Sequence, residues 1–578
     1  MGNGEAVGMP VSRVDLDKCI GCGTCVESCP MDVFRLDTRV EYRDEQSPCS
    51  MACPLGVRQR EYHDFVKMGM IEEAGEVMRL CHPMPAVTGR LCPHPCESQC
   101  ARTKIDQSVN ISALEQHLGD RLLATGPVPG VTRAAVPAGR NRVAVIGSGP
   151  AGLSAAYFLA LEGFEPTVFE KADKPGGLLR TAVPEFRLPE WMVDAQIESY
   201  RGMGIVFRTG VRVGVDLSVE ELRSQGYGAV VAATGASRPM GLSVPGSGAA
   251  GIVSAMKLLG AVKAVPAPAK TGSSESAAVL PGSPGPVAVV GGGSVALDAA
   301  RTALRLGADR VSIICLERLE PGLKDSMPAL ATEIDEGLAE GLTIYPSRGV
   351  DSFVVEDGRV SAVRCVECLS VRDEDGRFKP VYGDCVLPQV IEAQTVIMAI
   401  GQTADPALVP AEFAVGARGL IGVDEATSQA APGLFACGDA VSGASTVVEA
   451  LAAGKKVAAM VGRYLRDEGP SGAAEPAQCA AEPPAGRIEL AERVERRWRP
   501  AAERRGDFAE VVLPLSGHEA QVEAGRCLTC GSRSKIAYLD DCQVCKLCQH
   551  YCPTDAIEIT DGMLLGSLHS WNVVGLGR

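Results

Sequence analysis

Two short runs of cysteines carry the clearest chemical signal in the sequence. The first run consists of Cys19, Cys22, Cys25 and Cys29, the second of Cys542, Cys545, Cys548 and Cys552, and a proline follows each run. The first three thiolates at this spacing wrap around one [4Fe–4S] cube, and the fourth normally binds the other cube of a pair. Each run therefore predicts an iron–sulfur cluster, an interpretation that we prefer to a structural zinc site.

Short strands are expected on both sides of each run. Segments 12–16 and 33–36 flank the first run, and segments 536–539 and 556–559 flank the second, so each chain end corresponds to half of a two-cluster ferredoxin. We expect the two ends to meet in one composite unit. One cube is then held by Cys19, Cys22, Cys25 and Cys552, and the other by Cys542, Cys545, Cys548 and Cys29. Two alternatives are a pairing between the chains of a dimer and a cube closed by the four cysteines of each run.

Composition excludes several other classes of protein. The chain of 578 residues has 22 cysteines, of which ten fall within residues 19–100 and six within 527–552, a clustering that favours metal binding over disulfides. A net charge of −15 without a basic stripe argues against a nucleic-acid partner. We find no run of 18 apolar residues and no apolar signal core, so we expect no membrane span and a cytoplasmic location.

Two strand–glycine–helix patterns indicate dinucleotide-binding units. In the first, an apolar strand at 143–146 leads through a glycine loop into a helix at 153–162, and a second strand at 167–169 ends at an acid. The residues expected to contact a dinucleotide are Gly147, Gly149, Pro150, Ala151, Gly152 and Glu170. The first glycine permits the tight turn, the second lets the backbone approach a pyrophosphate, and the third lets helix and strand pack. The pyrophosphate lies at the helix N-terminus, and the acid accepts hydrogen bonds from ribose hydroxyls.

The second pattern follows a strand at 287–290. Its loop and helix start comprise Gly291, Gly293, Ser294 and Ala296. The next strand, 311–315, leads to Glu317 and Arg318, and Glu317 lies 21 residues beyond Ala296. A carboxylate at this place binds a ribose 2′-hydroxyl and repels a 2′-phosphate, so we expect NAD(H) rather than NADP(H). Arg318 and Lys324 are the residues that oppose this preference.

A second, less regular set of cysteines consists of Cys49, Cys53, Cys92, Cys96 and Cys100. The stretch 49–115, in particular its segment 85–93, resembles the N-terminal helical domain of the glutamate synthase small subunit and of dihydropyrimidine dehydrogenase. Two further segments, containing Gly177 and Leu178 and, far downstream, Gly438 and Asp439, resemble the FAD-binding signatures of flavoproteins with two dinucleotide domains. Together with residues 140–465, the resemblance covers roughly three quarters of the chain.

The resemblance implies FAD at the first nucleotide site, with Asp439 near its ribityl and phosphate groups, and two [4Fe–4S] clusters in the helical domain. The family has a further Cys-x2-Cys pair just before the position of Cys49, and this sequence lacks it there. Cys527 and Cys530 match the missing pair, and we expect them to join Cys49 and Cys100 around one cluster. The family's non-cysteine ligand corresponds to Glu115, with Cys81 as a competing candidate. Eight cysteines in the two runs, the five cysteines of the second set, Cys527, Cys530 and Glu115 provide sixteen ligands, enough for about four clusters.

These patterns and the resemblance predict an α/β fold with two Rossmann-like domains, a helical iron–sulfur domain and α+β ferredoxin-like segments. Stretches rich in Pro, Ala, Gly and Ser at 126–139, 264–286 and 468–486 indicate linkers or surface loops. The proposed division is a ferredoxin-like segment at 1–40, a helical iron–sulfur domain at 41–138, an FAD-binding domain at 139–245 and 406–467, an NAD(H)-binding domain at 246–405, a linker at 468–524 and a second ferredoxin-like segment at 525–578.

The expected function is that of an FAD-dependent NAD(P)H oxidoreductase that passes electrons between NADH and a ferredoxin or a partner redox enzyme. Nothing resembles the large glutamate synthase subunit or a pyrimidine-reducing barrel, so we expect the electron-input subunit of an oligomer or hetero-complex. No catalytic side chain is needed, because the cofactors supply the chemistry. Cys365 and Cys368 lie in an alternating strand pattern, and we do not expect them to form a redox-active disulfide. The alternatives are an electron-bifurcating transhydrogenase subunit, an NADPH-dependent glutamate synthase-type small subunit and a relay subunit with structural FAD.

Overall fold

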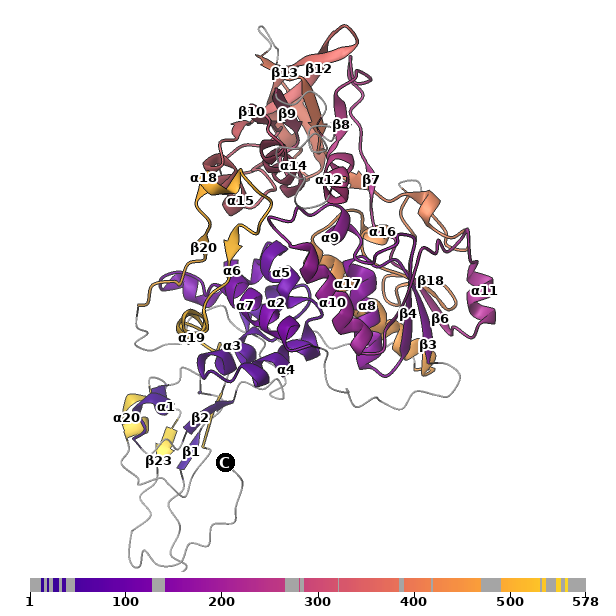
Figure 1. Ribbon diagram of the computed structural model, residues 1–578. Coiled ribbons are helices and arrows are strands. Elements are labelled where there is room, and N and C mark those ends of the chain that lie inside the picture. The colour runs from indigo at the N-terminus through magenta and orange to yellow at the C-terminus, as the bar shows by residue number, and fades with distance from the viewer. Residues whose placement is uncertain are drawn as a thin grey trace, which may run out of the picture.

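Four structural units are visible in the chain (Figure 1). They are two Rossmann-like domains, a helical domain between them and the chain ends, and a small unit in which the two ends meet. The computed structural model describes residues 12–14, 18–19, 24–30, 34–37, 47–126, 141–265, 280, 285–320, 322–383, 389–416, 419–468, 490–530, 533–536, 547–552 and 557–559. Within these residues, no helix has the length and apolar character that a bilayer crossing requires.

The first Rossmann-like domain is built on a six-stranded sheet in the order β18-β19-β6-β3-β4-β5. Its strands are β3 (Arg142–Ile146), β4 (Glu165–Glu170), β5 (Val206–Thr209), β6 (Ala229–Ala232), β18 (Gln429–Ala431) and β19 (Leu434–Ala436). All neighbours are parallel except β18 and β19. Its helices are α8 (Pro150–Leu161), α9 (Leu178–Thr181), α10 (Glu190–Gly202), α11 (Val219–Ser224), α16 (Asp439–Ser442) and α17 (Val447–Leu465). Helix α8 begins three residues earlier than predicted, because Pro150 has the backbone angle that the first helical position requires.

The second Rossmann-like domain has a parallel five-stranded sheet in the order β11-β10-β9-β16-β8. The strands are β8 (Ile252–Ser254), β9 (Pro286–Val290), β10 (Arg310–Ile314), β11 (Thr343–Tyr345) and β16 (Thr395–Met398), and the helices are α12 (Ala255–Ala264), α14 (Ser294–Arg305) and α15 (Ala331–Ala339). An antiparallel sheet of β12 (Arg348–Glu356), β13 (Arg359–Arg372), β14 (Phe378–Tyr382) and β15 (Gln389–Glu392) is inserted before β16.

The chain crosses between the two Rossmann-like domains twice, and the crossings lie side by side. Strand β7 (Arg238–Pro239) pairs antiparallel with β17 (Gln402–Thr403), and the turn η3 (Pro406–Leu408) follows. The predicted α/β class with two Rossmann-like domains is therefore confirmed, and the proposed domain boundaries stay a prediction. The connection between α12 and β9 is slightly shorter than the predicted stretch 264–286, because α12 extends to Ala264 and β9 begins at Pro286. Most of that stretch, and nearly all of the other two Pro- and Ala-rich stretches, lies outside the described residues.

The helical domain contains α2 (Pro48–Ala52), α3 (Gln59–Lys67), α4 (Ile71–Cys81), α5 (Pro85–Leu91), α6 (Pro95–Ser98), η1 (Ala101–Lys104) and α7 (Ile111–Ala124). Helices α5 and α7 pack closely at Gly119. A Cβ at this position would strike the backbone of Ala86, so the contact requires glycine. The domain shares one hydrophobic core with the first Rossmann-like domain. Two tyrosines of the first Rossmann-like domain also bind the helical domain. Tyr157 Oη donates to Arg79 O at 2.6 Å, and Tyr200 Oη donates to Pro83 O at 2.9 Å.

The two chain ends meet, as predicted (Figure 1). Strand β1 (Ser12–Val14) pairs antiparallel with β23 (Ile557–Ile559), and β2 (Phe34–Asp37) pairs antiparallel with β22 (Arg533–Ile536). Helix α1 (Thr24–Ser28) packs against α20 (Leu547–Tyr551). Strand β22 begins three residues earlier than the predicted 536–539, because its pairing with β2 places Ile536 opposite Phe34. Residues 537–539 lie outside the described residues.

Residues 490–530, which we call the C-terminal strap, connect three of these units. The strap contains β20 (Arg497–Trp498), α18 (Ala501–Arg504), β21 (Val512–Leu513) and α19 (Gly517–Gly525). Phe508 lies in the hydrophobic core of the second Rossmann-like domain, with its ring centroid 6.3 Å from that of Phe186. Helix α19 packs against α3 and α7 of the helical domain, and the strap then leads into β22.

A buried charge network joins the strap to α14 and α15. The side chain of Glu340 is fully buried and accepts from Arg301 Nη2 at 2.5 Å and from Arg305 Nη1 at 2.7 Å. Arg504 of the strap pairs with Glu336 of α15 and approaches Glu340 to 4.0 Å. The two arginines of α14 therefore depend on Glu340 for charge compensation.

Glu340→Gln should lower the free energy of unfolding by about 3 kcal/mol, because a neutral amide leaves two buried guanidinium groups uncompensated. The urea midpoint, followed by circular dichroism, measures the change. The matched control is Glu392→Gln, which removes an ion pair with Arg310 at 2.9 Å whose side chains are 65% and 55% exposed. This exposed pair should contribute less than about 1 kcal/mol. Equal midpoints for the two variants would contradict the role given to Glu340.

Candidate functional site

The first glycine loop has the geometry that a dinucleotide requires. Gly147 adopts φ +104°, and a Cβ there would strike Ala233 O. A Cβ on Gly152 would strike Gly147 O, so this glycine permits the close contact of α8 with the loop. By contrast, no described atom lies within 4 Å of the Cβ position of Gly149. The open space above Gly149, at the start of α8, fits a pyrophosphate.

Glu170, at the end of β4, is fixed by the same loop. Its buried carboxylate accepts from the Ser148 backbone N–H at 3.1 Å and from the Ser148 hydroxyl. Ser148 Oγ in turn accepts from Gly176 N at 2.9 Å, and Ala172 N donates to the second oxygen of Glu170 at 2.9 Å. Glu170 therefore lies at the glycine loop, where the prediction places the ribose of a dinucleotide.

A cavity of about 580 Å³ opens beside this loop. Of the residues predicted to bind the first dinucleotide, those that line the cavity are Gly147, Gly149, Pro150, Ala151, Glu170, Gly177, Leu178 and Asp439. Gly152 and Gly438 do not line it, because both are packing positions: a Cβ on Gly438 would lie 2.6 Å from Ala151 Cβ. Asp439 accepts from Ser445 Oγ at 2.7 Å, and burial raises the pKa of Asp439.

The cavity extends to the second Rossmann-like domain. Ser294, Val295 and Asp298 of α14 form part of its wall. Arg187, from the first domain, bridges the cavity with an ion pair to Asp298 at 3.0 Å and a second pair to Glu333. Burial raises the pKa of Asp298 to about 6, and the neighbouring Arg187 opposes this shift. The sequence analysis missed Arg187 and Asp298, because they are far apart in the chain and belong to no motif.

The second glycine loop repeats the design of the first. Gly291 adopts φ +134°, with Ala399 O against its Cβ position, and the nearest atom to the Cβ position of Gly293 is Pro328 Cγ at 3.9 Å. Ala296 is fully buried in the domain core. Glu317 Oε2 lies 2.5 Å from the Cβ position of Gly292, so the acid again lies against the middle residue of the loop.

Glu317 and its neighbours lie away from the cavity that opens beside the first glycine loop. Of the second predicted set, only Ser294 lines that cavity; Gly291, Gly293, Ala296, Glu317 and Arg318 do not. Burial raises the pKa of Glu317. Arg318 and Lys324 are exposed nearby. The carboxylate of Glu317 is thus partly buried beside the loop, whereas Arg318 and Lys324 lie at the surface.

In the helical domain, Cys53, Cys92 and Cys96 are near enough to Glu115 for its charge to affect their thiols. Burial raises the pKa of each thiol, and the charge of Glu115 adds to this effect at all three. Burial alone would raise the pKa of the Glu115 carboxyl, but His82, His94 and Thr88 outweigh it and hold that pKa below its usual range. His82 Nε2 lies 3.2 Å from Glu115, and the His94 backbone N–H donates to Cys92 Sγ at 3.3 Å. Three thiols and one carboxylate fit the donor set of a cluster.

The other four helical-domain candidates, Cys49, Cys100, Cys527 and Cys530, also lie close together. Burial raises the pKa of Cys527, and the next causes include the neighbouring thiols of Cys49, Cys530 and Cys100. Burial likewise raises the pKa of Cys49 to about 11, with Cys100 adding to it. Cys49 and Cys96 lie inside the short helices α2 and α6, each of which starts at a proline.

Cys81 differs from these candidates. Its thiol donates to Val77 O at 3.2 Å within its own helix and belongs to the shared core. Cys365 and Cys368 lie in β13, away from the cavity, and neither forms a disulfide. Within the described residues, no disulfide therefore lies beside the cavity at the first glycine loop.

The unit at the chain ends gathers the two cysteine runs. Cys25 and Cys548 share a small core with Phe34 and Ile557, and Cys29 and Cys552 pack against it. Cys19 is buried, whereas Cys22, Cys542 and Cys545 lie outside the described residues. Cysteines from both ends therefore meet, and the ligand exchange between the runs stays a prediction.

Among the described residues, no group of three or more Cys, His, Asp or Glu side chains is placed to hold a single metal ion.

Comparison with known proteins agrees with this geometry. The family model described as pyridine nucleotide-disulphide oxidoreductase matches residues 141–454. The model for dihydropyrimidine dehydrogenase domain II, with a 4Fe-4S cluster, matches residues 42–126, and a 4Fe-4S binding domain matches residues 12–35.

Three relatives show how far the similarity extends. The β subunit of an NADP(+)-dependent formate dehydrogenase from Moorella thermoacetica is 35% identical over 524 residues, which are 84% of this chain and 70% of that protein. The glutamate synthase [NADPH] small chain of Mycobacterium tuberculosis is 33% identical over 72% of this chain and 85% of its own length. The NADPH-Fe(3+) oxidoreductase β subunit of Geobacter sulfurreducens is 30% identical over 73% of this chain and 64% of its own length.

These matches confirm the resemblance to the glutamate synthase small subunit and the presence of FAD- and NAD(P)-binding and 4Fe-4S domains. They also confirm a flavin-dependent NAD(P)H oxidoreductase type. The chain belongs to the pyridine nucleotide-disulphide oxidoreductase family, as a glutamate synthase small-subunit-like flavoprotein with added iron–sulfur domains.

Proposed function

We propose that the chain passes electrons between NADH and a ferredoxin or a partner redox enzyme, through FAD and four [4Fe–4S] clusters. The observation that carries the proposal is the composition of one cavity wall. The cavity is lined by the first glycine loop, by α14 of the second domain, and by Leu91 and Pro93, which flank Cys92. The first glycine loop, α14 and the two chain neighbours of a cluster-ligand candidate thus line a single space.

Each part of the cavity wall has a separate task. The open face of Gly149 admits the FAD pyrophosphate, and Glu170 accepts hydrogen bonds from the ribose. The Arg187–Asp298 ion pair holds α14 across the cavity and sets the approach of the nicotinamide. FAD, when bound, would couple the transfer of two electrons as one hydride to the transfer of single electrons. No side chain of the chain has to donate or accept a proton in this scheme.

The cluster ligands continue from the cavity toward the chain ends. Cys53, Cys92, Cys96 and Glu115 would hold the cluster beside the flavin, because Leu91 and Pro93, on either side of Cys92, line the cavity. The ferredoxin-like unit at the far end of the helical domain would deliver electrons to the acceptor (Figure 1). Two of the relatives are named β subunits, which supports a role as the electron-input subunit of a larger complex.

The names of the three relatives specify NADP(H), whereas Glu317 favours NADH. We expect a higher kcat/KM for NADH than for NADPH with a dye acceptor, since the Glu317 carboxylate repels a 2′-phosphate. Glu317→Arg should shift the preference toward NADPH by at least tenfold. Glu320→Arg is the control, because it adds the same charge on an exposed side chain of the same loop. An NADPH preference of the unchanged chain would contradict the assignment.

The ligand set predicts the cofactor content. Sixteen ligands correspond to about sixteen iron atoms per chain in four cubes, together with one FAD. Anaerobic purification followed by iron, acid-labile sulfide and flavin analysis tests this number. Eight iron atoms or fewer, or stoichiometric zinc, would exclude the four-cluster proposal.

Cys96→Ala should separate the flavin from the clusters. NADH should still bleach the flavin absorbance in stopped-flow experiments, while electron paramagnetic resonance (EPR) should show that the other clusters are no longer reduced by NADH. Cys81→Ala is the matched control, a buried cysteine of the same domain whose thiol bonds within its own helix. Normal cluster reduction in Cys96→Ala, or its loss in Cys81→Ala, would overturn the proposed ligand set.

A further inference from the structure

Residues 507–511 of the C-terminal strap, which we call the junction, lie outside all three regions that the family models match. The strap runs from the helical domain to the second Rossmann-like domain and back, and the junction lies on its return path (Figure 1). Arg499 donates through both Nη atoms to the Asp507 carboxylate at 2.8 Å, and the Arg499 backbone N–H donates to Val511 O at 3.0 Å. The junction is therefore a closed turn with a defined shape.

The junction contacts the second Rossmann-like domain through Asp507 and Phe508. Arg305 Nε of α14 donates to Asp507 O at 3.1 Å. Phe508 is buried and belongs to the hydrophobic core of that domain. The helix held in this way is the one whose residues Ser294 and Asp298 line the cavity.

The junction contacts the first Rossmann-like domain at Phe186, in the turn between α9 and α10. The Val511 backbone N–H donates to Phe186 O at 3.0 Å, beside the packed rings of Phe186 and Phe508. Phe186 is fully buried, and its side chain belongs to the core of the second domain rather than to that of its own. Arg305 Cζ lies 4.0 Å from the centroid of its ring. The next residue, Arg187, lines the cavity.

The junction contacts the helical domain through Glu510. Arg90 Nε donates to Glu510 Oε1 at 2.6 Å, and Asp120 of α7 accepts from the two Nη atoms of Arg90 at 2.7 and 2.9 Å. The Arg90 side chain is only 3% exposed, so loss of a carboxylate partner is costly. Arg90 directly precedes Leu91, which lines the cavity.

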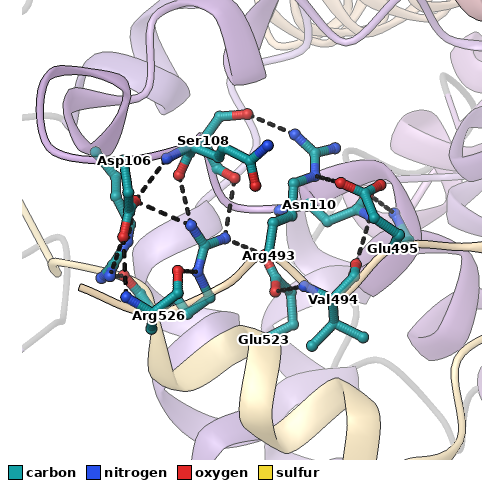
Figure 2. A network of polar contacts seen from close by, with 12 residues as sticks. Asp106, Ser108, Asn110, Arg493, Val494, Glu495, Glu523 and Arg526 are labelled. Atoms are coloured by element: carbon teal, nitrogen blue, oxygen red, sulfur yellow. Dashed lines mark hydrogen bonds and ion pairs between the residues drawn. The ribbon is translucent and has the colours of Figure 1, made fainter. Parts of the chain in front are cut away.

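The strap is fixed to the helical domain on both sides of the junction (Figure 2). Arg526 is 2% exposed and donates to Ser108 O at 3.0 Å and to Glu523 Oε1 at 2.7 Å. Glu523 is fully buried and accepts from the backbone N–H groups of Asn110 and Val494, each at 2.7 Å. Val494 precedes the junction in the chain and Glu523 follows it. One network therefore ties both halves of the strap to the helical domain.

Five consecutive residues thus contact all three units that form the cavity wall. In each unit, the contacted residue is next to a residue that lines the cavity or lies on the same helix as one. None of residues 507–511 lines the cavity itself, so the junction acts on the cavity only through these neighbours.

We propose that residues 507–511 are a three-way junction that sets the relative positions of the nicotinamide, the flavin and the nearest cluster. Phe508 is a positioning residue for hydride transfer, because it joins α14 to the turn that carries Arg187. Glu510 is a positioning residue for the passage of electrons into the helical domain. These roles rest on the proposed function, whereas the junction itself stands on the contacts described above.

Phe508→Ala in the full, cofactor-loaded chain tests the contact between the two Rossmann-like domains. The rate constant of flavin reduction at saturating NADH, from stopped-flow absorbance, should fall roughly tenfold or more, since a misplacement of about 1 Å can cost about 100-fold. The KM for NADH should stay nearly unchanged, because the second glycine loop and Glu317 lie within one domain. A purely structural role would lower the unfolding midpoint and leave the rate constant of the folded chain as it is.

Two variants accompany Phe508→Ala. Phe508→Leu keeps most of the buried volume, so it should fold and give an intermediate rate constant. Leu513→Ala shortens an exposed side chain of the same strap and is the control, with an unchanged rate constant. A rate constant equal to that of the unchanged chain in every folded Phe508 variant would overturn the positioning role of Phe508.

Hydrogen–deuterium exchange tests the junction without turnover. Phe508→Ala should speed exchange in residues 183–189 and leave it unchanged in residues 143–160 of β3 and α8 in the same domain. Unchanged exchange in residues 183–189 would reject the junction. Faster exchange there, in a protein whose unchanged form shows no flavin reduction by NADH, would reject the proposed function and leave the junction intact.

Glu510→Gln tests the contact with the helical domain. Flavin bleaching by NADH should be retained, whereas the EPR signals of the reduced clusters should appear more slowly after mixing and freezing. Glu503→Gln is the matched control, because it removes an exposed carboxylate from the same strap, and it should leave both steps unchanged. Cluster reduction as fast in Glu510→Gln as in the control would overturn the role of Glu510.

Discussion

The guanidinium of Arg526 is the constraint on which the placement of the whole C-terminal strap depends. A buried guanidinium is costly unless each of its donors has an acceptor, and here five acceptors come from the 106–108 loop, Glu523 and Ala491. Once Arg526 is in place, α19 lies against α3 and α7, and β22 is directed toward β2.

The same strap also ties the second Rossmann-like domain to the helical domain. Phe508 enters the core of that domain, and Arg90 of α5 binds Glu510 at 2.6 Å. On the other side, the helical domain and the first Rossmann-like domain share one hydrophobic core. The nicotinamide-binding domain is therefore connected by the paired crossings β7 and β17, by the Arg187–Asp298 pair and by the strap. Flavin, nicotinamide and clusters are held in one framework.

Local patterns predicted the parts of this framework that local sequence determines. The glycine loops of Gly147 and Gly291 and the acids Glu170 and Glu317 follow from spacing along a single strand–helix–strand unit, and the structure places each acid against the middle of its loop. The meeting of the chain ends followed from the chemistry of the cysteine runs. Contacts between distant segments gave no such signal. The Arg187–Asp298 pair and the bonds of Arg526 to residues 106–108 join residues over 100 positions apart, and the start of β22 depends on its pairing with β2.

The pairing of Ser12 with Ile559 has a consequence for biosynthesis. A ribosome that adds about 5–20 residues per second needs roughly half a minute to two minutes to travel from one to the other. Throughout that time the first cysteine run is translated but lacks its partner strand and helix. The composite unit of the two ends can therefore form only after β23 has been synthesised, and a chain truncated before β23 lacks the strand that pairs with β1.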